Sequence, residues 1–221
     1  MKPIENLIIV AHPDDEFHWF SSVLNKPNTA IVFCFQNKYP DSPCLLEYVT
    51  GVFQVMEYYY QKLGIPVFWL QTIRTMRPIV FGKINPQTRG HLRTNLRAVL
   101  SVLNPKYVYT HNPWGEYGHS EHMLVHEVVK TLRGDILFSD YKSMTKPAKN
   151  GKDEILKQKP DIEKIAEKYS KKLAAVRSEP ADLRLKKKLV AKYLESGAGS
   201  SLKYSQEEVN ADEERFVRYR R

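Results

Sequence analysis

Two clusters of ionisable residues in the sequence have side chains of the types that hydrolytic metal sites use. The first is His12-Pro13-Asp14-Asp15-Glu16, which directly follows a short apolar run at residues 7–11. One aspartate here could serve merely as the N-cap of a following helix. A histidine followed by two aspartates has no such simple structural explanation, so this cluster is the first candidate for chemistry.

The second cluster is residues 111–122, which read HNPWGEYGHSEH and follow another apolar run. His119 and His122 are three residues apart, so they share one face if a helix begins there. Imidazole and carboxylate ligands together suit zinc or another borderline divalent cation, and the same ligands would also hold iron or cobalt. His12, Asp15 and His122 would supply two nitrogens and one carboxylate. Positions would then stay open for water and substrate, which is typical of a catalytic site.

Three further histidines have weaker claims to a chemical role. His126 follows His122 by four residues, which is the metal-ligand spacing of zincin helices, but the glutamate of that signature is replaced by Met123. We therefore interpret His126 as a helix-face residue, with a ligand role as the alternative. His18 and His91 are isolated, and we expect each to be a surface or core residue.

Strands and helices alternate along the first 141 residues, and this order predicts how the two clusters are positioned. Apolar runs typical of buried strands occur at residues 7–11, 29–35, 67–70, 107–110 and 136–138. Helical patterns occur at residues 15–24, 43–63, 91–103 and 120–132, and after residue 141 at 162–176 and 183–194. Such βαβ units form a Rossmann-like three-layer α/β/α fold, here with a mostly parallel sheet of about five strands. Because ligands bind at the carboxyl ends of such strands, both clusters lie where chemistry is expected.

The length and composition of the chain are typical of one globular domain. Its 221 residues are 42% hydrophobic and 27% charged, which argues against disorder and against a need for a disulfide framework. No apolar run approaches the roughly 18 residues that a membrane helix needs, and the first ten residues do not resemble a signal peptide. With only Cys34 and Cys44 in the chain, a reducing, cytoplasmic location is expected.

The net charge of +9 is concentrated in the last third of the chain. Residues 1–141 contain 13 Lys and Arg against 12 Asp and Glu, whereas residues 142–221 contain 21 against 13. We therefore expect a core at 1–141 and a basic, largely helical C-terminal extension of the same domain at 142–221. The extension could attract an anionic partner, such as a phosphorylated ligand, a polyanionic glycan or a membrane surface, or it could be only a solvated helical face. Its aromatic residues are not interleaved as a stacking platform, so no specific nucleic-acid partner is expected.

Together the two clusters resemble the PIG-L/LmbE-like family of zinc-dependent N-deacetylases. The family pattern is a strand that ends in AHPDDE and, after a fourth strand, a glycine-flanked His-x-x-His; residues 11–16 and 118–122 match these two motifs. The resemblance covers the layout of residues 6–141 and extends more weakly to 188–196 and 213–216. It implies one zinc ion per chain and removal of the N-acetyl group from a sugar of the N-acetylglucosamine (GlcNAc) type.

The resemblance also implies a role for each residue of the two motifs. It implies three metal ligands, which are His12, Asp15 and His122. Asp14 resembles the general base that takes a proton from metal-bound water, and His119 resembles the group that stabilises the tetrahedral intermediate or protonates the leaving amine. Glu121 stands where the family usually has aspartate and would orient His119. Tyr117 resembles a mobile tyrosine that polarises the amide carbonyl in some members.

The substrate-contacting positions differ from the family pattern. Residues 17–22 lack the glycines common in the family, and the helix expected at 43–63 lacks the usual Arg-x-x-Glu. Residues 74–90 show no periodicity, contain four cationic side chains and follow the third strand on the active-site side. We expect Arg74 and Arg77 there to bind an anionic part of the substrate; a solvated loop is the alternative.

Three hypotheses about function follow. The first is a metal-dependent deacetylase of an N-acetylated sugar in a glycoconjugate or metabolite. The second is a metal-dependent amidase that acts on a non-sugar acyl amide, since the same chemistry attacks any well-placed amide. The third is a non-catalytic protein that binds glycans or polyanions. The presence of Asp14 and His119 argues against the third, because a binding protein needs neither.

Overall fold

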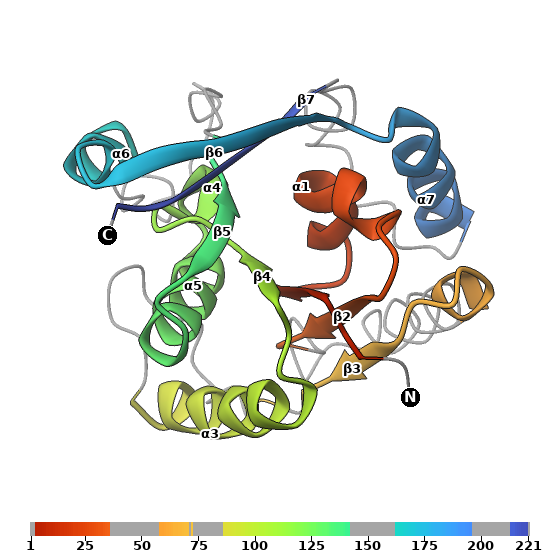
Figure 1. Ribbon diagram of the computed structural model, residues 1–221, viewed down its shortest axis with the longest axis horizontal. Coiled ribbons are helices and arrows are strands. Elements are labelled where there is room, and N and C mark those ends of the chain that lie inside the picture. Colours follow the sequence, from red (N-terminus) through yellow and green to blue (C-terminus); the bar gives the residue numbers. More distant parts are fainter. Residues whose placement is uncertain are drawn as a thin grey trace, which may run out of the picture.

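The computed structural model of the chain has a central sheet with helices on both faces (Figure 1). The structure describes residues 3–35, 58–70, 72, 86–141, 162–195 and 213–220. Within them the sheet has seven strands in the order β3-β2-β1-β4-β5-β7-β6. The strands are β1 (Asn6–Val10), β2 (Thr29–Phe33), β3 (Val67–Trp69), β4 (Tyr107–Thr110), β5 (Ile136–Ser139), β6 (Leu173–Pro180) and β7 (Glu213–Tyr219). The helices are α1 (Asp15–Leu24), α3 (Pro86–Leu103), α4 (Gly115–Gly118), α5 (Ser120–Leu132), α6 (Ile162–Ser170) and α7 (Leu183–Glu195).

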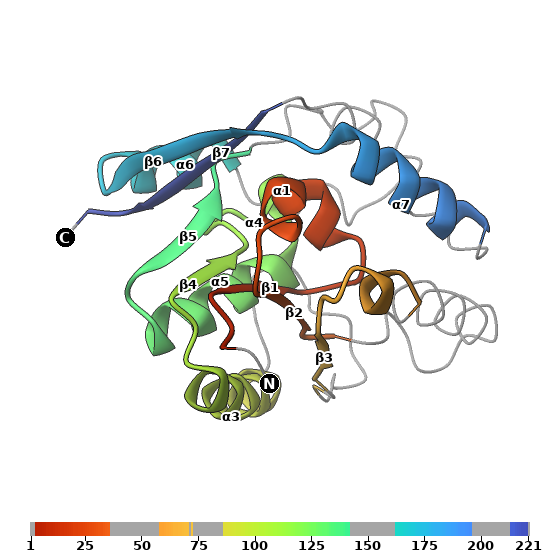
Figure 2. The ribbon, with the colours of Figure 1, turned by 45° about the vertical axis from the view of Figure 1, so that its right-hand side comes forward.

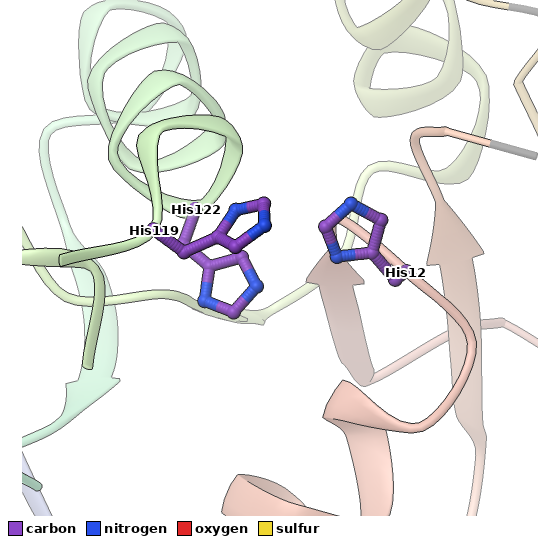
Figure 3. Close-up of side chains that lie close together, drawn as sticks. All are labelled: His12, His119 and His122. Carbon is purple, nitrogen blue, oxygen red and sulfur yellow. The ribbon is translucent and has the colours of Figure 1, made fainter. Parts of the chain in front are cut away.

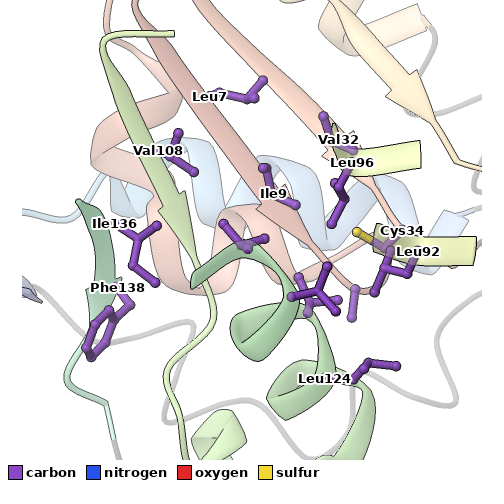
Figure 4. Close-up of a cluster of buried hydrophobic side chains, with 14 of the residues drawn as sticks. Leu7, Ile9, Val32, Cys34, Leu92, Leu96, Val108, Leu124, Ile136 and Phe138 are labelled. Carbon is purple, nitrogen blue, oxygen red and sulfur yellow. The ribbon is translucent and has the colours of Figure 1, made fainter. Parts of the chain in front are cut away.

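Strand β1 lies inside the sheet and is buried on both faces, which explains its apolar sequence. Leu7 and Ile9 pack into the cluster on the side of α3 and α5, which Figure 4 shows in close-up. Ile8 and Val10 pack into the opposite cluster. Because successive side chains of a strand point to opposite faces, a strand between two helical layers must be apolar at every position.

Each helical layer places its own apolar stripe on the sheet. On one face, α3 and α5 contribute leucines four residues apart and their neighbours, among them Leu92, Leu96 and Leu124. On the other face, Phe17 of α1 and Leu189 of α7 are fully buried. Burying each such side chain contributes about 1.5–3 kcal/mol. The three-layer α/β/α fold with a mostly parallel sheet is confirmed.

The sheet is larger than the five strands expected from the sequence. β1 to β5 pair in parallel, whereas β7 is antiparallel to both β5 and β6. The helix expected at 162–176 ends at Ser170, and the chain then enters β6. The local sequence at 174–176 is compatible with a helix or a strand. It forms a strand because it pairs with β7, which is distant in the sequence. The described residues after position 141 thus include two strands as well as two helices.

The remaining boundaries follow local signals. α3 begins at Pro86, a residue that suits the first position of a helix, so the end of the expected loop at 74–90 is helical. Most of that loop, including Arg74 and Arg77, and most of the helix expected at 43–63 lie outside the described residues; residues 58–62 are helical. No helix in the described part of the chain is long and apolar enough to cross a membrane.

Candidate metal centre and active site

The two sequence clusters meet at one edge of the sheet. β1 and β4 are neighbouring parallel strands, with Ile9 opposite Thr110, so their carboxyl ends lie side by side. His12 follows β1, and His119 and His122 lie at the start of α5. Figure 3 shows His12 facing these two histidines from the opposite side of the site. The topology of the sheet therefore joins residues that are about a hundred positions apart in the sequence.

The side chains at this edge form two overlapping groups of potential metal ligands. Within each group the donor atoms lie within 4.8 Å of one another: His12, His119 and His122 in the first, and Asp15, His111 and His122 in the second. The expected ligands are close together, since Asp15 Oδ1 is 3.3 Å from His122 Nε2 and Asp15 Oδ2 is 3.5 Å from His12 Nδ1. His111 is an additional member that the sequence did not single out; its Nε2 is 3.3 Å from Asp15 Oδ2.

The protonation of Asp15 and His122 suits a divalent cation. Burial alone would raise the pKa of Asp15, but the imidazoles of His122 and His111 hold it well below its usual range, so the carboxylate is ionised. Burial lowers the pKa of His122, so its imidazole is neutral. Burial alone would lower the pKa of His111, but the carboxylates of Glu116 and Asp15 raise it to about 10. The ionised carboxylate of Asp15 beside the neutral imidazole of His122 is the pair of donors that zinc and similar cations bind.

The buried carboxylate of Glu116 holds two of these imidazoles in place. Its Oε2 accepts from Nδ1 of His122 at 2.8 Å and from Nδ1 of His111 at 3.1 Å. Burial alone would raise the pKa of Glu116, but the two imidazoles lower it to about 2. With Nδ1 protonated, Nε2 of His122 keeps its lone pair on the side of Asp15. Glu116 stands inside the second cluster, but its sequence context does not mark it as a functional residue.

The chain around Glu116 bends sharply to bring it inward. Asn112 donates its backbone N–H to Glu116 Oε1 at 3.0 Å, and Asn112 Oδ1 accepts the backbone N–H of Glu116 at 2.9 Å. Gly115 has φ of +65°, and a Cβ there would lie 2.9 Å from Cγ of Met123. Glycine fits this position because, without a Cβ, it adopts a positive φ at no steric cost. The sequence Asn-Pro-Trp-Gly-Glu therefore forms the turn that places the Glu116 carboxylate against the two imidazoles.

Asp14 and Glu16 lie on either side of Asp15. Asp14 has φ of +114°, a conformation that is strained for any residue except glycine. Its backbone N–H donates to Glu16 Oε2 at 2.9 Å, and Glu16 Oε1 accepts the hydroxyl of Tyr60 at 2.7 Å. Burial raises the pKa of Glu16 to about 8. Glu16 thus fixes the turn that carries Asp14 directly before the expected ligand Asp15.

The other expected site residues are placed as follows. Glu121 Oε2 is 2.5 Å from His12 Nε2, so in this structure Glu121 contacts His12; its expected role of orienting His119 stays a prediction. Tyr117 belongs to α4, and its side chain lies outside the described residues. Both ring nitrogens of His126 form hydrogen bonds, from Nδ1 to the backbone oxygen of His111 at 2.6 Å and from the Tyr219 hydroxyl to Nε2 at 2.8 Å.

Fold and site together define the class of protein. It is a three-layer α/β protein with a buried cluster of histidine and carboxylate side chains at the carboxyl ends of β1 and β4. The chain belongs to the PIG-L family, because the family model described as GlcNAc-PI de-N-acetylase matches residues 7–132. No curated protein sequence matches the chain.

Solved structures of similar fold cover nearly the whole chain. One is a deacetylase from the biosynthesis pathway of teicoplanin, with a TM-score of 0.63, 13% identity and 98% coverage of both chains. Another is the A40926 pseudoaglycone deacetylase Dbv21, with a TM-score of 0.58, 12% identity and coverage of 100% of this chain and 98% of the other. A third is the N,N'-diacetylchitobiose deacetylase of Pyrococcus horikoshii, with a TM-score of 0.59, 12% identity and coverage of 99% and 84%. These likenesses extend the shared fold beyond the family match to the C-terminal strands.

Proposed function

We propose that this protein is a metal-dependent hydrolase that removes the acetyl group from an N-acetylated sugar of the GlcNAc type, with zinc as the cation. The observation that carries the proposal is the buried carboxylate of Asp15, which lies 3.5 Å from Nδ1 of His12 and 3.3 Å from Nε2 of His122 at the edge of the sheet. Family membership gives the reaction class. The similar structures are deacetylases, and one acts on N,N'-diacetylchitobiose.

The residues present fit a bound divalent cation. His12, Asp15 and His122 would hold it, and Glu116 would keep the His122 imidazole oriented through Nδ1. A cation held there supplies Lewis-acid polarisation of the acetamide carbonyl and makes a nearby water molecule a stronger acid. His119 lies close to His12 and His122, and His111 lies close to Asp15 and His122, while His111 Nε2 accepts the backbone N–H of Ala11 at 2.9 Å.

The protein's own residues then carry the proton transfers. Asp14 accepts the proton that water loses as its oxygen attacks the acetamide carbon, and such a base contributes about 10²–10⁴-fold in rate. His119 donates towards the oxygen on which negative charge develops, or gives a proton to the nitrogen as the C–N bond breaks. The products are acetate and the free amine of the sugar.

A free-amine assay on a panel of substrates tests the proposal. The panel contains N-acetyl sugars, N-acetyl nucleotide sugars, a glycolipid with an N-acetyl sugar and non-sugar acyl amides, each assayed with added Zn²⁺ and after chelation. We expect amine release from at least one N-acetyl sugar, lost on chelation and in an Asp14→Asn variant. Turnover restricted to non-sugar amides would support the amidase hypothesis instead. Metal-bound protein that leaves every substrate intact would contradict both.

A further inference from the structure

Helix α1, which begins inside the metal motif, is broken at Phe20. The backbone of Phe20 has φ of −137° and ψ of 27°, far from helical values. In an unbroken helix the N–H of Ser21 would donate to the carbonyl of Phe17, and the N–H of Ser22 to that of His18. Such a break therefore leaves two backbone donors and two acceptors in a buried region, and each needs another partner.

The freed donors are taken up by one carboxylate from the far end of the chain. Glu214 of β7 accepts the backbone N–H of Ser21 at 2.9 Å and that of Ser22 at 3.0 Å. It also accepts both serine hydroxyls, at 2.5 Å and 2.7 Å. Four hydrogen bonds thus join Glu214 to two residues of α1.

A buried lysine from α7 serves the acceptor side of the same break. Nζ of Lys186 donates to the carbonyl of His18 at 3.1 Å and lies 3.3 Å from Glu214 Oε1. Lys186 is fully buried and Glu214 is 5% exposed. The ion pair therefore occupies the break in α1, with the carboxylate on the N–H side and the ammonium on the carbonyl side. Figure 2 shows α1 beneath the C-terminal strands with α7 beside it.

The same C-terminal strand also reaches the other half of the metal centre. The hydroxyl of Tyr219 donates to His126, which in turn donates to the backbone carbonyl of His111 at the end of β4. β7 thus contacts α1, which follows β1, through Glu214 and α5, which begins with the second histidine pair, through Tyr219. A strand fixed at both ends against these elements sets the distance between them.

We propose that Lys186 and Glu214 are positioning residues of the metal centre, because their ion pair holds the break in α1 and thereby fixes Asp15 relative to His122. The inference rests on the proposed function only in that the centre binds a cation; it does not depend on which amide is hydrolysed. A buried ion pair is a weak source of stability by itself, since its desolvation offsets its attraction. The role we assign to it is the geometry that it imposes on α1.

Cation binding by the whole protein tests the proposal. Zn²⁺ affinity is measured by competition with a chelator, and the visible absorption of the Co²⁺-loaded protein reports the geometry of the ligands. In Glu214→Gln and in Lys186→Met we expect Zn²⁺ affinity to fall by at least about tenfold and the Co²⁺ spectrum to change. The matched controls are Glu213→Gln and Lys187→Met, which alter exposed neighbours of the same type and should bind as the wild type does.

The outcomes separate positioning from a merely structural role. Variants with lower thermal stability but wild-type Zn²⁺ affinity and Co²⁺ spectrum would overturn the proposal. If Glu214→Gln does not fold, the milder Ser21→Ala/Ser22→Ala double variant is measured instead. It removes two of the four hydrogen bonds to Glu214 and keeps the charge of the carboxylate. An unchanged Zn²⁺ affinity of this double variant would overturn the proposal as well. A wild-type protein that binds no cation would count against the proposed function itself, and that measurement is made first.

Discussion

Replacing Glu116 by glutamine tests how far the metal centre depends on one buried carboxylate. The carboxylate accepts three N–H groups, from Nδ1 of His111, Nδ1 of His122 and the backbone of Asn112. Glutamine has a single oxygen, and its amide nitrogen can only donate. At least one N–H group then loses its acceptor, or an imidazole moves its proton from Nδ1 to Nε2. A proton on Nε2 of His122 would occupy the lone pair that a cation needs.

The pKa of Glu116 gives the size of the expected effect. The pKa falls from 4.5 to about 2, because two imidazoles bind the carboxylate more strongly than burial disfavours its charge. A shift of this size corresponds to roughly 3 kcal/mol of folding free energy. Since the folded-state pKa is lowered, this contribution is complete above the unfolded pKa of 4.5 and is lost as the pH falls towards 2. We also expect Zn²⁺ affinity to drop by about 10–100-fold, as for other residues that orient a ligand.

Urea unfolding of the metal-free proteins at pH 7 and at pH 3 measures the difference, and chelator competition measures the affinity. Glu116→Gln should have a lower free energy of unfolding than the wild type at pH 7, and the difference between the two free energies should be smaller at pH 3. Glu127→Gln is the matched control, because Glu127 is exposed on α5 and pairs with Arg89 at the surface; it should change stability by less than about 1 kcal/mol. Equal stability of Glu116→Gln and wild type at pH 7, with unchanged Zn²⁺ affinity, would refute the reasoning.

Four further predictions can each be checked with one variant and one assay. Asp14→Asn should retain its cation in metal analysis but lower kcat by about 10²–10⁴-fold, since an amide cannot take the proton; near-normal turnover would point to a different base. Burial lowers the pKa of His126 to about 4, so between pH 6.5 and pH 4 this imidazole is protonated in the unfolded chain but not in the folded protein. His126 should therefore cost the wild type up to roughly 3 kcal/mol of unfolding free energy between pH 6.5 and pH 4 in urea titrations. In a His126→Asn variant the loss should be smaller by about this amount, while buried His18, whose pKa is lowered to about 3, still contributes its own loss. Gly115→Ala should lower unfolding free energy by about 1–2 kcal/mol because of its positive φ, with a shift of the thermal midpoint as the readout. Neutralising Arg74 and Arg77 together should raise KM for a phosphorylated or acidic substrate and leave KM for a neutral N-acetyl sugar almost unchanged; equal effects on both would exclude charge recognition.

Local sequence patterns predicted most of the parallel half of the fold. The strand at Tyr107–Thr110 and the helices at Asp15–Leu24 and Ser120–Leu132 were expected with the bounds that the structure has. These elements carry strong apolar periodicity and clear polar boundaries. Since the fold class follows from their alternation, the sequence alone places both chemical clusters at strand ends.

Features that depend on contacts between distant residues could not be predicted in this way. Ser22 and Glu214 are 192 positions apart, and neither sequence neighbourhood signals the other. Glu116 reads as an ordinary loop residue, since its positive φ and its two imidazole partners arise from the turn after β4. His111 was part of the second cluster, but only the register of β1 against β4 brings it to Asp15.

The position of β7 in the sheet has a consequence for how the protein is synthesised. In the described sheet β7 lies between β5 and β6, although it follows both in the chain. A ribosome releases the chain from its N-terminus, so β5 emerges with an unpaired edge and β6 without its neighbour. Glu214 and Tyr219 reach α1 and His126 only when β7 has inserted. The contacts of β7 with the elements around the candidate metal centre therefore form late in folding, and a nascent chain that stops short of β7 exposes a strand edge that is prone to aggregation.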